Sequence, residues 1–524
     1  MKTFWCVAAV LCVATANETP TLRLRITDQI VKEIRKLARD TEMIDLLKRA
    51  VRVQSDNKVT LKEFTFEPNI EFVPPNQLRL TINRTNTVLV QDVWIAGKFE
   101  PVEVTYSGSE FDLTLTLSRS PTNFIAIDMP SCDVTPLRVS ANDSSFDAAG
   151  TEAEMRNAAA LACPQLRNGL ALLHNLAIDP RATNIFGPKV ATDLGLAVDP
   201  RVTENALQLD WSGRSRVLLA PTLNGRSAPA FSTYAPRGRP IADNNDASRM
   251  FYAFASEDFF NMALKALHIA EPQFGQFVVT REFLQPVHGL ILSTLKDISK
   301  AIEAQVPQEW DNARFRVQTR EQPMSVLLLP HRSYPVVIHW PVTVTVMPTN
   351  RRQSVSSAPR FDVDLSLSFD AQLNTTAGRR LPRVWATGSA LSAWVANVRA
   401  LGKSPTRTQL EQISTRLAGE LNATLSALVA STIASGNRAL DGFESQGAPH
   451  QSDVVFDVGD DGADTASQNS ESAGQVVSNV VSFPKIDLHY ERGSVSLRWD
   501  NSVDKKQIEK IVQQIENGKK QEAH

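Results

Sequence analysis

Residues 122–139 read TNFIAIDMPSCDVTPLRV, and the setting of Cys132 here, together with Cys163, is the most informative feature of the chain. The apolar residues ahead of Cys132 are typical of a β-strand. Cys163 lies in the next segment, residues 155–178, whose apolar spacing predicts a helix. A bond between the two cysteines would clamp a helix onto a sheet. One such bridge in so long a chain is unlike the cysteine-dense pattern of small secreted modules, so it indicates a large fold.

The first residues are typical of a secretory signal. Lys2 supplies a positive start, residues 4–13 are apolar, and residues 14–16 fit a small-residue cleavage site. The apolar run is shorter than the roughly 20 residues that span a bilayer. We therefore expect residues 1–16 to be removed and the protein to be secreted and extracellular. The cysteines at positions 6 and 12 leave with the signal, and an oxidising compartment makes a Cys132–Cys163 disulfide the default.

Other features agree with an extracellular globular protein. Sequons predict N-glycosylation at Asn83, Asn142, Asn374 and Asn422. No later stretch is apolar for long enough to span a membrane. The formal net charge of the 524 residues is −2, which gives no reason to expect a nucleic-acid partner. The eight histidines show no metal-ligand spacing, so neither a metal site nor a cofactor is expected.

Helical and strand patterns alternate along the first half of the chain. Helical spacing runs over residues 26–51, and short strand signals lie between residues 59 and 127. A second helix over residues 151–178 contains Pro164, which must kink or restart it. Between residues 213 and 242 there are four prolines, five arginines and no acidic residue, which predicts an irregular linker.

The second half partly repeats this order. A strand over residues 249–254 and a helix over 256–268 are followed by further strand patterns and by a helix over 409–433. Residues 443–474 hold seven acidic residues and no lysine or arginine, which is typical of a disordered loop. Strands return between residues 485 and 499, before a last stretch with helical spacing.

These elements appear in an order that resembles a known family. Ser131-Cys132 follows an apolar strand, Cys163 lies in the next helix, and a proline-rich centre precedes RMFYAFASEDFFNMA at residues 249–263. The series resembles the family of bactericidal/permeability-increasing protein, LPS-binding protein, and the cholesteryl ester and phospholipid transfer proteins. The closing strand pattern from Phe483 to Trp499 also fits that family.

The resemblance implies an α+β fold: an elongated two-domain boomerang, each half a twisted antiparallel barrel-like sheet wrapped on a long helix, joined by a central sheet. It also implies an apolar lipid pocket in each half. The predicted organisation is a signal peptide (1–16), an N-terminal lipid-binding barrel domain (17–217), a proline-rich linker (218–246), a C-terminal lipid-binding barrel domain (247–503, with a disordered acidic insertion at 443–475), and a C-terminal amphipathic helix with a polar tail (504–524).

Apolar residues on the expected helices are the candidates for the pocket walls, with ordinary core packing as the alternative for each. In the N-terminal domain they are Ile26, Ile30, Ile34 and Leu37 on the first helix, and Leu166, Leu170 and Leu173 beyond the cysteine. In the C-terminal domain they are Phe254, Phe259, Phe260 and Leu264. The final helix is expected either to cover a pocket mouth or to dock on the surface as a plain tail.

The leading hypothesis is a secreted lipid-binding or lipid-transfer protein for phospholipid-like amphiphiles, which also meets a membrane or lipoprotein surface. The alternative is an antibacterial protein of innate immunity that binds bacterial lipopolysaccharide. Residues 91–106 carry Lys98 against Asp92, Glu100 and Glu103, and this local balance does not favour a phosphorylated ligand. An enzyme is not expected, because the chain contains neither a Gly-x-Ser-x-Gly elbow nor a His-Glu-x-x-His zinc motif, and no catalytic residue is assigned.

Overall fold

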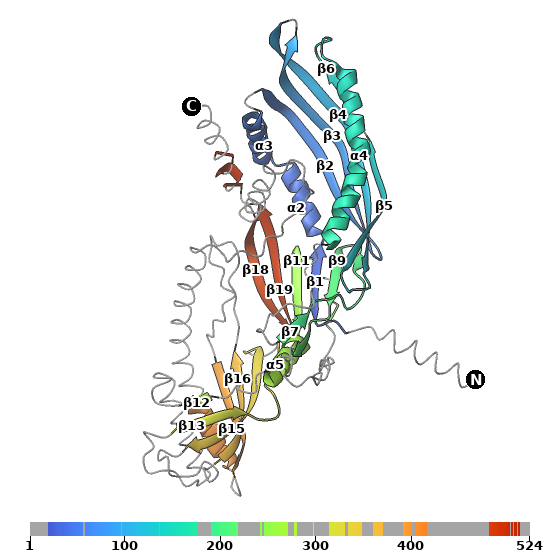
Figure 1. Cartoon of the computed structure of the whole chain (residues 1–524). Helices are drawn as coiled ribbons and strands as arrows, with labels where there is room; N and C mark the ends of the chain where they lie inside the picture. Colours follow the sequence, from blue (N-terminus) through green and yellow to red (C-terminus); the bar gives the residue numbers. More distant parts are fainter. Residues whose placement is uncertain are drawn as a thin grey trace, which may run out of the picture.

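Antiparallel strands dominate the computed structural model of this chain, and few helices accompany them (Figure 1). This arrangement confirms the expected α+β class. The residues that the structure describes are 19–55, 58–95, 97–135, 137–175, 190–217, 241–243, 246–270, 277–279, 297, 314–330, 334–347, 360–369, 391–400, 405–416, 481–503, 505–506, 508–510 and 512–513. The signal peptide, the acidic insertion and most of the linker lie outside these ranges.

A six-stranded central sheet joins segments that are far apart in the sequence. Its order is β18 (Val481–Glu491), β19 (Ser494–Val503), β11 (Phe251–Ser256), β1 (Leu22–Thr27), β9 (Ala206–Trp211) and β8 (Arg201–Thr203). β1 pairs antiparallel with both β9 and β11, and β11 pairs with β19. The beginning, the middle and the end of the chain therefore meet in one sheet, as the resemblance implies.

The N-terminal half carries a long antiparallel sheet beyond the central one (Figure 1). Its strands are β2 (Val59–Val73), β3 (Gln77–Ile95), β4 (Lys98–Arg119), β5 (Ile125–Thr135) and β6 (Arg138–Ala141). The sequence pattern predicts separate strands over residues 77–82, 87–95, 102–106 and 111–117, where the structure has only the two long strands β3 and β4. This prediction is wrong because polar residues near Asn83 and Gly108 interrupt the alternation only locally. The ladder continues across them through register shifts between Ile82 and Asn86.

The first helix differs most from its predicted bounds. Residues 22–27 form β1, and the expected helix over 26–51 is instead two helices, α2 (Gln29–Ala38) and α3 (Thr41–Gln54). Ile26 is therefore a strand residue and not a helix residue, because LRLRIT at 22–27 alternates with the two-residue period of a strand. Asp40 separates the helices: its Oδ1 accepts hydrogen bonds from the backbone N–H groups of Glu42 and Met43, at 3.0 and 3.2 Å, and so caps α3.

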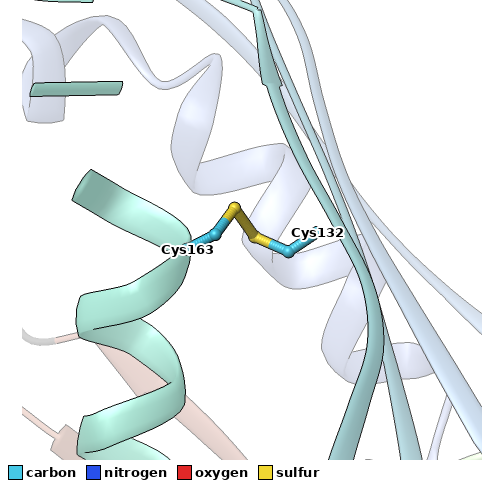
Figure 2. The surroundings of a disulfide bond; sticks show 2 residues. All are labelled: Cys132 and Cys163. Carbon is cyan, nitrogen blue, oxygen red and sulfur yellow. A yellow bond between two sulfur atoms is a disulfide. The ribbon is translucent and has the colours of Figure 1, made fainter. Parts of the chain in front are cut away.

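The disulfide lies where the sequence places it. Cys132 on β5 and Cys163 on α4 (Ala148–Asn175) are bonded, so the bridge clamps the helix onto the strand beside it (Figure 2). Pro164 lies inside α4, and the helix continues past it. The expected bridge between a helix and a sheet is confirmed.

The C-terminal half has its own six-stranded sheet, which lies at the other end of the molecule (Figure 1). It consists of β12 (Phe277–Val279), β13 (Arg314–Thr319), β15 (Val336–Met347), β16 (Arg360–Phe369) and β17 (Leu391–Ala400), with β14 (Ser325–Leu328) beside β15. The helix α5 (Glu257–Ala270) packs on β7 (Val190–Asp193) and β10 (Arg214–Val217) through Ala266. Residues 407–416 are helical, and the rest of the helix predicted over 409–433 lies outside the described residues.

Candidate functional site

The burial of β1 is reversed relative to its polarity. Along the strand, Arg23, Arg25 and Thr27 are buried, whereas Leu22, Leu24 and Ile26 are only half-buried. Successive side chains of a strand point to opposite faces, so one face of β1 is polar and covered, and the other is apolar and partly open. Apolar residues are normally the better covered ones, and this reversal marks the apolar face as the candidate site.

The neighbouring strands continue this apolar face. Leu24 lies opposite Ala253 of β11 and Leu209 of β9, and Ala253 lies opposite Leu497 of β19. Residues that lie opposite one another in a ladder share a face. The face, called the apolar face below, consists of Leu22, Leu24, Ile26, Leu207, Leu209, Trp211, Phe251, Ala253, Ala255, Val495, Leu497, Trp499, Ile486, Leu488 and Tyr490. Of these residues Leu207 and Leu209 are buried, and the others are half-buried.

An aromatic pair lies in the apolar face where β11 and β19 run side by side. The rings of Phe251 and Trp499 are stacked, with centroids 5.3 Å apart and planes 12° apart. The two residues are partners in the ladder, so the stack spans adjacent strands. Both side chains keep part of their surface exposed, and a hydrocarbon chain could contact them there without displacing protein.

The polar face of the same sheet is covered by the end of the linker region. Residues 241–243 and 246–250, called the strap below, follow this face and bond to β1. The Arg23 Nη1 donates to the carbonyl of Ala242 at 3.1 Å and to Asp243 Oδ1 at 3.0 Å. The Arg25 Nη1 donates to the carbonyl of Asp246 at 2.8 Å. These bonds explain why arginines are buried on this side.

Ion pairs and a ring complete the polar face. The guanidinium groups of Arg25 and Arg498 lie 5.9 and 5.6 Å from the centroid of the Tyr252 ring. Burial lowers the pKa of Arg25, although Tyr252 and Asp246 work in the opposite direction. Burial also opposes the charge of Arg249, but its hydrogen bonds to Asp487 and Asp500 outweigh this effect and raise its pKa. Charges on this face thus pair with one another, and a polar hollow of about 430 Å³ is lined by Arg249, its partner Asp487, and Arg498.

Two clusters of protein side chains flank the apolar face. On the N-terminal side, Leu24, Ile26 and Trp211 pack against a buried cluster that includes Val31 of α2 and Phe72 of β2. On the C-terminal side, Tyr490 and Val495 pack against a cluster that includes Leu328 and is joined by Phe260 and Leu264 of α5. The apolar face therefore leads from one half of the molecule into the other.

The predicted wall residues fall into different places around this face. Ile26 lies on β1 in the apolar face, and Ile30 of α2 packs against the same N-terminal cluster. Ile34 and Leu37 of α2 are half-buried. On α4, Leu166 is exposed and Leu170 is half-buried, and the side chain of Leu173 lies outside the described part of the chain. Their contact with lipid stays a prediction.

In the second half the aromatic candidates separate. Phe254 is buried on the polar face with Ile241 and Tyr252, so it lies on the side opposite the apolar face. Phe259 is buried and meets Phe260 edge to face, with ring centroids 5.4 Å apart. Phe260 and Leu264 pack against the C-terminal cluster. Leu24, Phe251, Leu497 and Trp499 were missed, although the period-two alternation of their strands was the signal that could have found them.

The C-terminal segment, of which residues 505–506, 508–510 and 512–513 are described, lies beside α3. The Lys505 Nζ is 2.6 Å from Asp40 Oδ2 and 2.6 Å from Glu42 Oε2, and Arg49 lies 3.9 Å from Glu509. Val512 is buried. A hydrogen bond from Lys505 is the main reason that the pKa of Asp40 is lowered, and the same contact raises the pKa of Lys505. The segment is thus docked on the N-terminal half, and its expected role as a cover stays a prediction.

The described residues also bear on metal binding, membrane crossing and glycosylation. No group of three or more histidine, cysteine, aspartate or glutamate residues there could hold a metal ion. Within the same ranges, none of the helices combines the length and the apolar character needed to cross a bilayer. Asn83 and Asn142 are exposed, whereas Asn374 and Asn422 lie outside the described residues. Glycosylation stays a prediction for all four.

Comparisons with known proteins identify no family for this chain. No protein-family model matches it, and no curated protein matches it either. Among solved structures it is similar to one titled "Crystal structure of lipopolysaccharide binding protein", with 12% sequence identity and a TM-score of 0.37 over 93% of this chain and 99% of that chain. A likeness at this level identifies no ligand, so the function has to come from the chain's own geometry.

Proposed function

We propose that this protein is a secreted carrier that holds a phospholipid-like amphiphile on the apolar face of its central sheet. The observation that supports the proposal is the reversed burial of β1, where the arginines are covered and the aliphatic residues are left half-open. A soluble protein gains nothing from leaving such a surface to water. A ligand with hydrocarbon chains would complete its burial.

The hydrophobic effect alone would hold such a ligand. Each methylene group that leaves water contributes about 0.8 kcal/mol, so burial of about ten methylenes of one acyl chain would supply the about 8 kcal/mol that corresponds to micromolar affinity. The Phe251–Trp499 stack and the aliphatic residues of β1 and β19 would form the floor under the chain. This binding needs no catalytic group, metal or cofactor, and we propose that the protein does not act as an enzyme.

The two flanking clusters favour a site near the middle of the sheet. Trp211 on β9 and Tyr490 on β18 already pack against protein, whereas Phe251, Ala253 and Leu497 lie between them. The acyl chains would therefore cross β11 and the part of β19 around Leu497, where the described residues of the apolar face are not among those packed against either cluster. A head group would remain at the edge of the sheet, near water.

Endotoxin binding is the second hypothesis from the sequence and stays a prediction. A phosphorylated lipid needs a cationic surface. In the hairpin of β3 and β4, the Lys98 Nζ lies 2.5 Å from Glu100 Oε1, and Lys62 is paired with Glu103. These pairs balance the cations at this hairpin, so a lipid phosphate would meet no net positive charge there, and zwitterionic phospholipid is the proposed ligand class.

Extraction of lipid from the purified protein tests the proposal. Native mass spectrometry of the secreted, full-length protein is expected to show bound lipid, and Leu497→Gln is expected to lose most of it. Leu327→Gln is the matched control, because Leu327 is an exposed leucine on β14 at 44% exposure and lies outside the apolar face. A wild-type protein free of lipid, or equal loss in both variants, would contradict the proposal.

A further inference from the structure

Two aromatic side chains are exposed to solvent near the turn of the β3–β4 hairpin. Trp94 near the end of β3 is 61% exposed, and Phe99 near the start of β4 is 67% exposed. They are the most exposed of the large hydrophobic residues in the described part of the chain. The hairpin reaches the end of the molecule that lies away from the C-terminal sheet (Figure 1).

The two rings form one preformed unit. Trp94 and Phe99 are direct partners in the β3–β4 ladder. Their ring centroids lie 4.8 Å apart with planes at 71°, an edge-to-face pair. Gly97 has a φ of 92° beside them, which lets the chain turn tightly and keeps the pair at the extreme end of the hairpin. Each ring packs against the other, so a partner would contact an ordered apolar surface rather than two independently moving side chains.

The charges around this point are nearly balanced. Lys98 is the only cation in residues 91–106, and it is paired with Glu100. Farther along the ladder, Lys62 of β2 is paired with Glu103. Asp92 and Lys58 are both exposed where β2 begins, and the Asp92 N–H donates to the Lys58 carbonyl at 3.1 Å. An aromatic point without net positive charge has no electrostatic reason to select an anionic surface.

We propose that the Trp94–Phe99 pair is an anchor that inserts into the interface of an electrically neutral, zwitterionic lipid surface. Tryptophan and phenylalanine gain from the boundary between head groups and acyl chains, where the ring leaves water and the indole N–H keeps a polar partner. The inference rests on the proposed function only for the choice of lipid as the partner. It assigns to this hairpin the place where the carrier touches the surface that supplies or receives its ligand.

Two properties of binding follow from this assignment. Attachment is expected to be nearly unchanged when salt is added, because it does not depend on charge pairing. It is also expected to be nearly as strong on neutral vesicles as on vesicles that contain anionic lipid. A surface that docked through lysine and arginine would show a steep loss with salt.

Vesicle flotation of the full-length protein tests the proposal. Pure phosphatidylcholine vesicles and vesicles of equal parts phosphatidylcholine and phosphatidylserine are compared at low and high salt. The double variant Trp94→Ser/Phe99→Ser is expected to bind both at least about tenfold more weakly, a change of about 1.4 kcal/mol. The control variant Leu161→Ser/Leu327→Ser removes two exposed leucines, at 56% and 44% exposure, from α4 and β14. It is expected to bind as the wild type does.

Two results of the flotation experiment would contradict the proposal directly. Equal flotation of the wild type and the aromatic double variant would overturn the proposal, and so would wild-type binding that is lost with salt. If the double variant instead turns a dimer into a monomer and still floats, the pair contacts a second copy of the chain and the proposal is wrong. Lipid extraction remains a separate measurement: a lipid-free protein that floats through Trp94 and Phe99 would reject the carrier function and leave the anchor standing.

Discussion

Arg23 and Asp210 form a nearly buried ion pair across the ladder of β1 and β9. The Arg23 Nε donates to Asp210 Oδ1 at 2.6 Å, and the two side chains are only 7% and 8% exposed. The same guanidinium also holds the strap through Ala242 and Asp243. Arg23 thus joins β1 and β9 of the central sheet to the strap.

Removal of this arginine is expected to be strongly destabilising. Arg23→Met leaves the Asp210 carboxylate buried without its cation, which costs about 3–5 kcal/mol of unfolding free energy. Urea denaturation followed by circular dichroism measures the change. Lys98→Met is the matched control, because the Lys98–Glu100 pair is exposed and worth at most about 1 kcal/mol. Arg23→Met/Asp210→Leu is expected to be more stable than Arg23→Met alone, and equal stability of Arg23→Met and wild type would refute the prediction.

The disulfide is expected to stabilise the N-terminal half. Cys132 and Cys163 are 31 residues apart, and closing such a loop contributes roughly 3–4 kcal/mol in the chain-entropy account. Cys132→Ser/Cys163→Ser should therefore lower the urea midpoint of the N-terminal half. A thiol titration of the denatured wild type provides the control and should find no free thiol among these two cysteines. Two free thiols there would show that the bridge does not form.

Docking of the C-terminal segment is expected to depend on pH at both ends of the range. The pKa of Asp40 is lowered in the folded state, so its contact with Lys505 is complete above the ordinary carboxylate pKa of about 4 and is lost as the pH falls further. The pKa of Lys505 is raised, so the contact is complete below the ordinary lysine pKa of about 10 and is lost as the pH rises further. Docking should thus be constant near neutral pH.

Hydrogen exchange of residues 508–513 measures this docking. Lys505→Glu should speed exchange there at neutral pH, because it places a carboxylate beside Asp40 and Glu42. Lys510→Glu is the control, since it makes the same charge change at an exposed position of the same segment. Equal exchange in the two variants would mean that the segment is held by Val512 and not by the ion pairs.

Quenching by brominated phosphatidylcholine tests where the ligand lies. Trp499 belongs to the half-open part of the apolar face, so a bound brominated chain should quench part of the tryptophan fluorescence. Trp499→Phe should lose that component and keep lipid binding, because the phenylalanine still stacks on Phe251. Trp340→Phe is the control, since Trp340 donates to Thr319 in the C-terminal sheet and lies outside the apolar face. Trp211 in the same face and Trp94 at the hairpin can keep part of the quenching, so only quenching that is undiminished in Trp499→Phe would place the ligand elsewhere.

The local patterns of the sequence were sufficient for much of the fold. The strand before Cys132, the helix that contains Cys163, and the strands near Phe251 and Trp499 were all predicted from period and composition. The long strands β3 and β4 were each predicted as two shorter strands. The glycine and polar residues around Gly108 are typical of a turn, but in the structure they form a bulge within the ladder. The strand β1 was missed because its last two residues, Ile26 and Thr27, were read as the start of the helix and the four before them were given no element.

The sequence predicted an apolar site for lipid, but it did not predict which residues form the candidate site. Apolar helix stripes such as that of Ile30 and Ile34 were expected to line a pocket, whereas the structure draws attention to the sheet face of Leu24, Phe251 and Trp499. Helix periodicity cannot distinguish a residue that faces protein from one that faces a ligand. Phe254 shows the difference, since it lies one residue from Ala253 and points to the covered side.

Once residues 22–27 are known to be a strand, their sequence shows which side chains share a face, because alternation is a property of the extended backbone. It also indicated the pairing of Cys132 with Cys163, because the expected removal of Cys6 and Cys12 with the signal peptide leaves two cysteines and one choice. Only the tertiary structure decided that the arginine side of β1 is the covered one. The partners that make burial of Arg23 and Arg25 tolerable, Asp210 and the strap, come from residues nearly two hundred positions or more away along the chain. No local pattern carries that information.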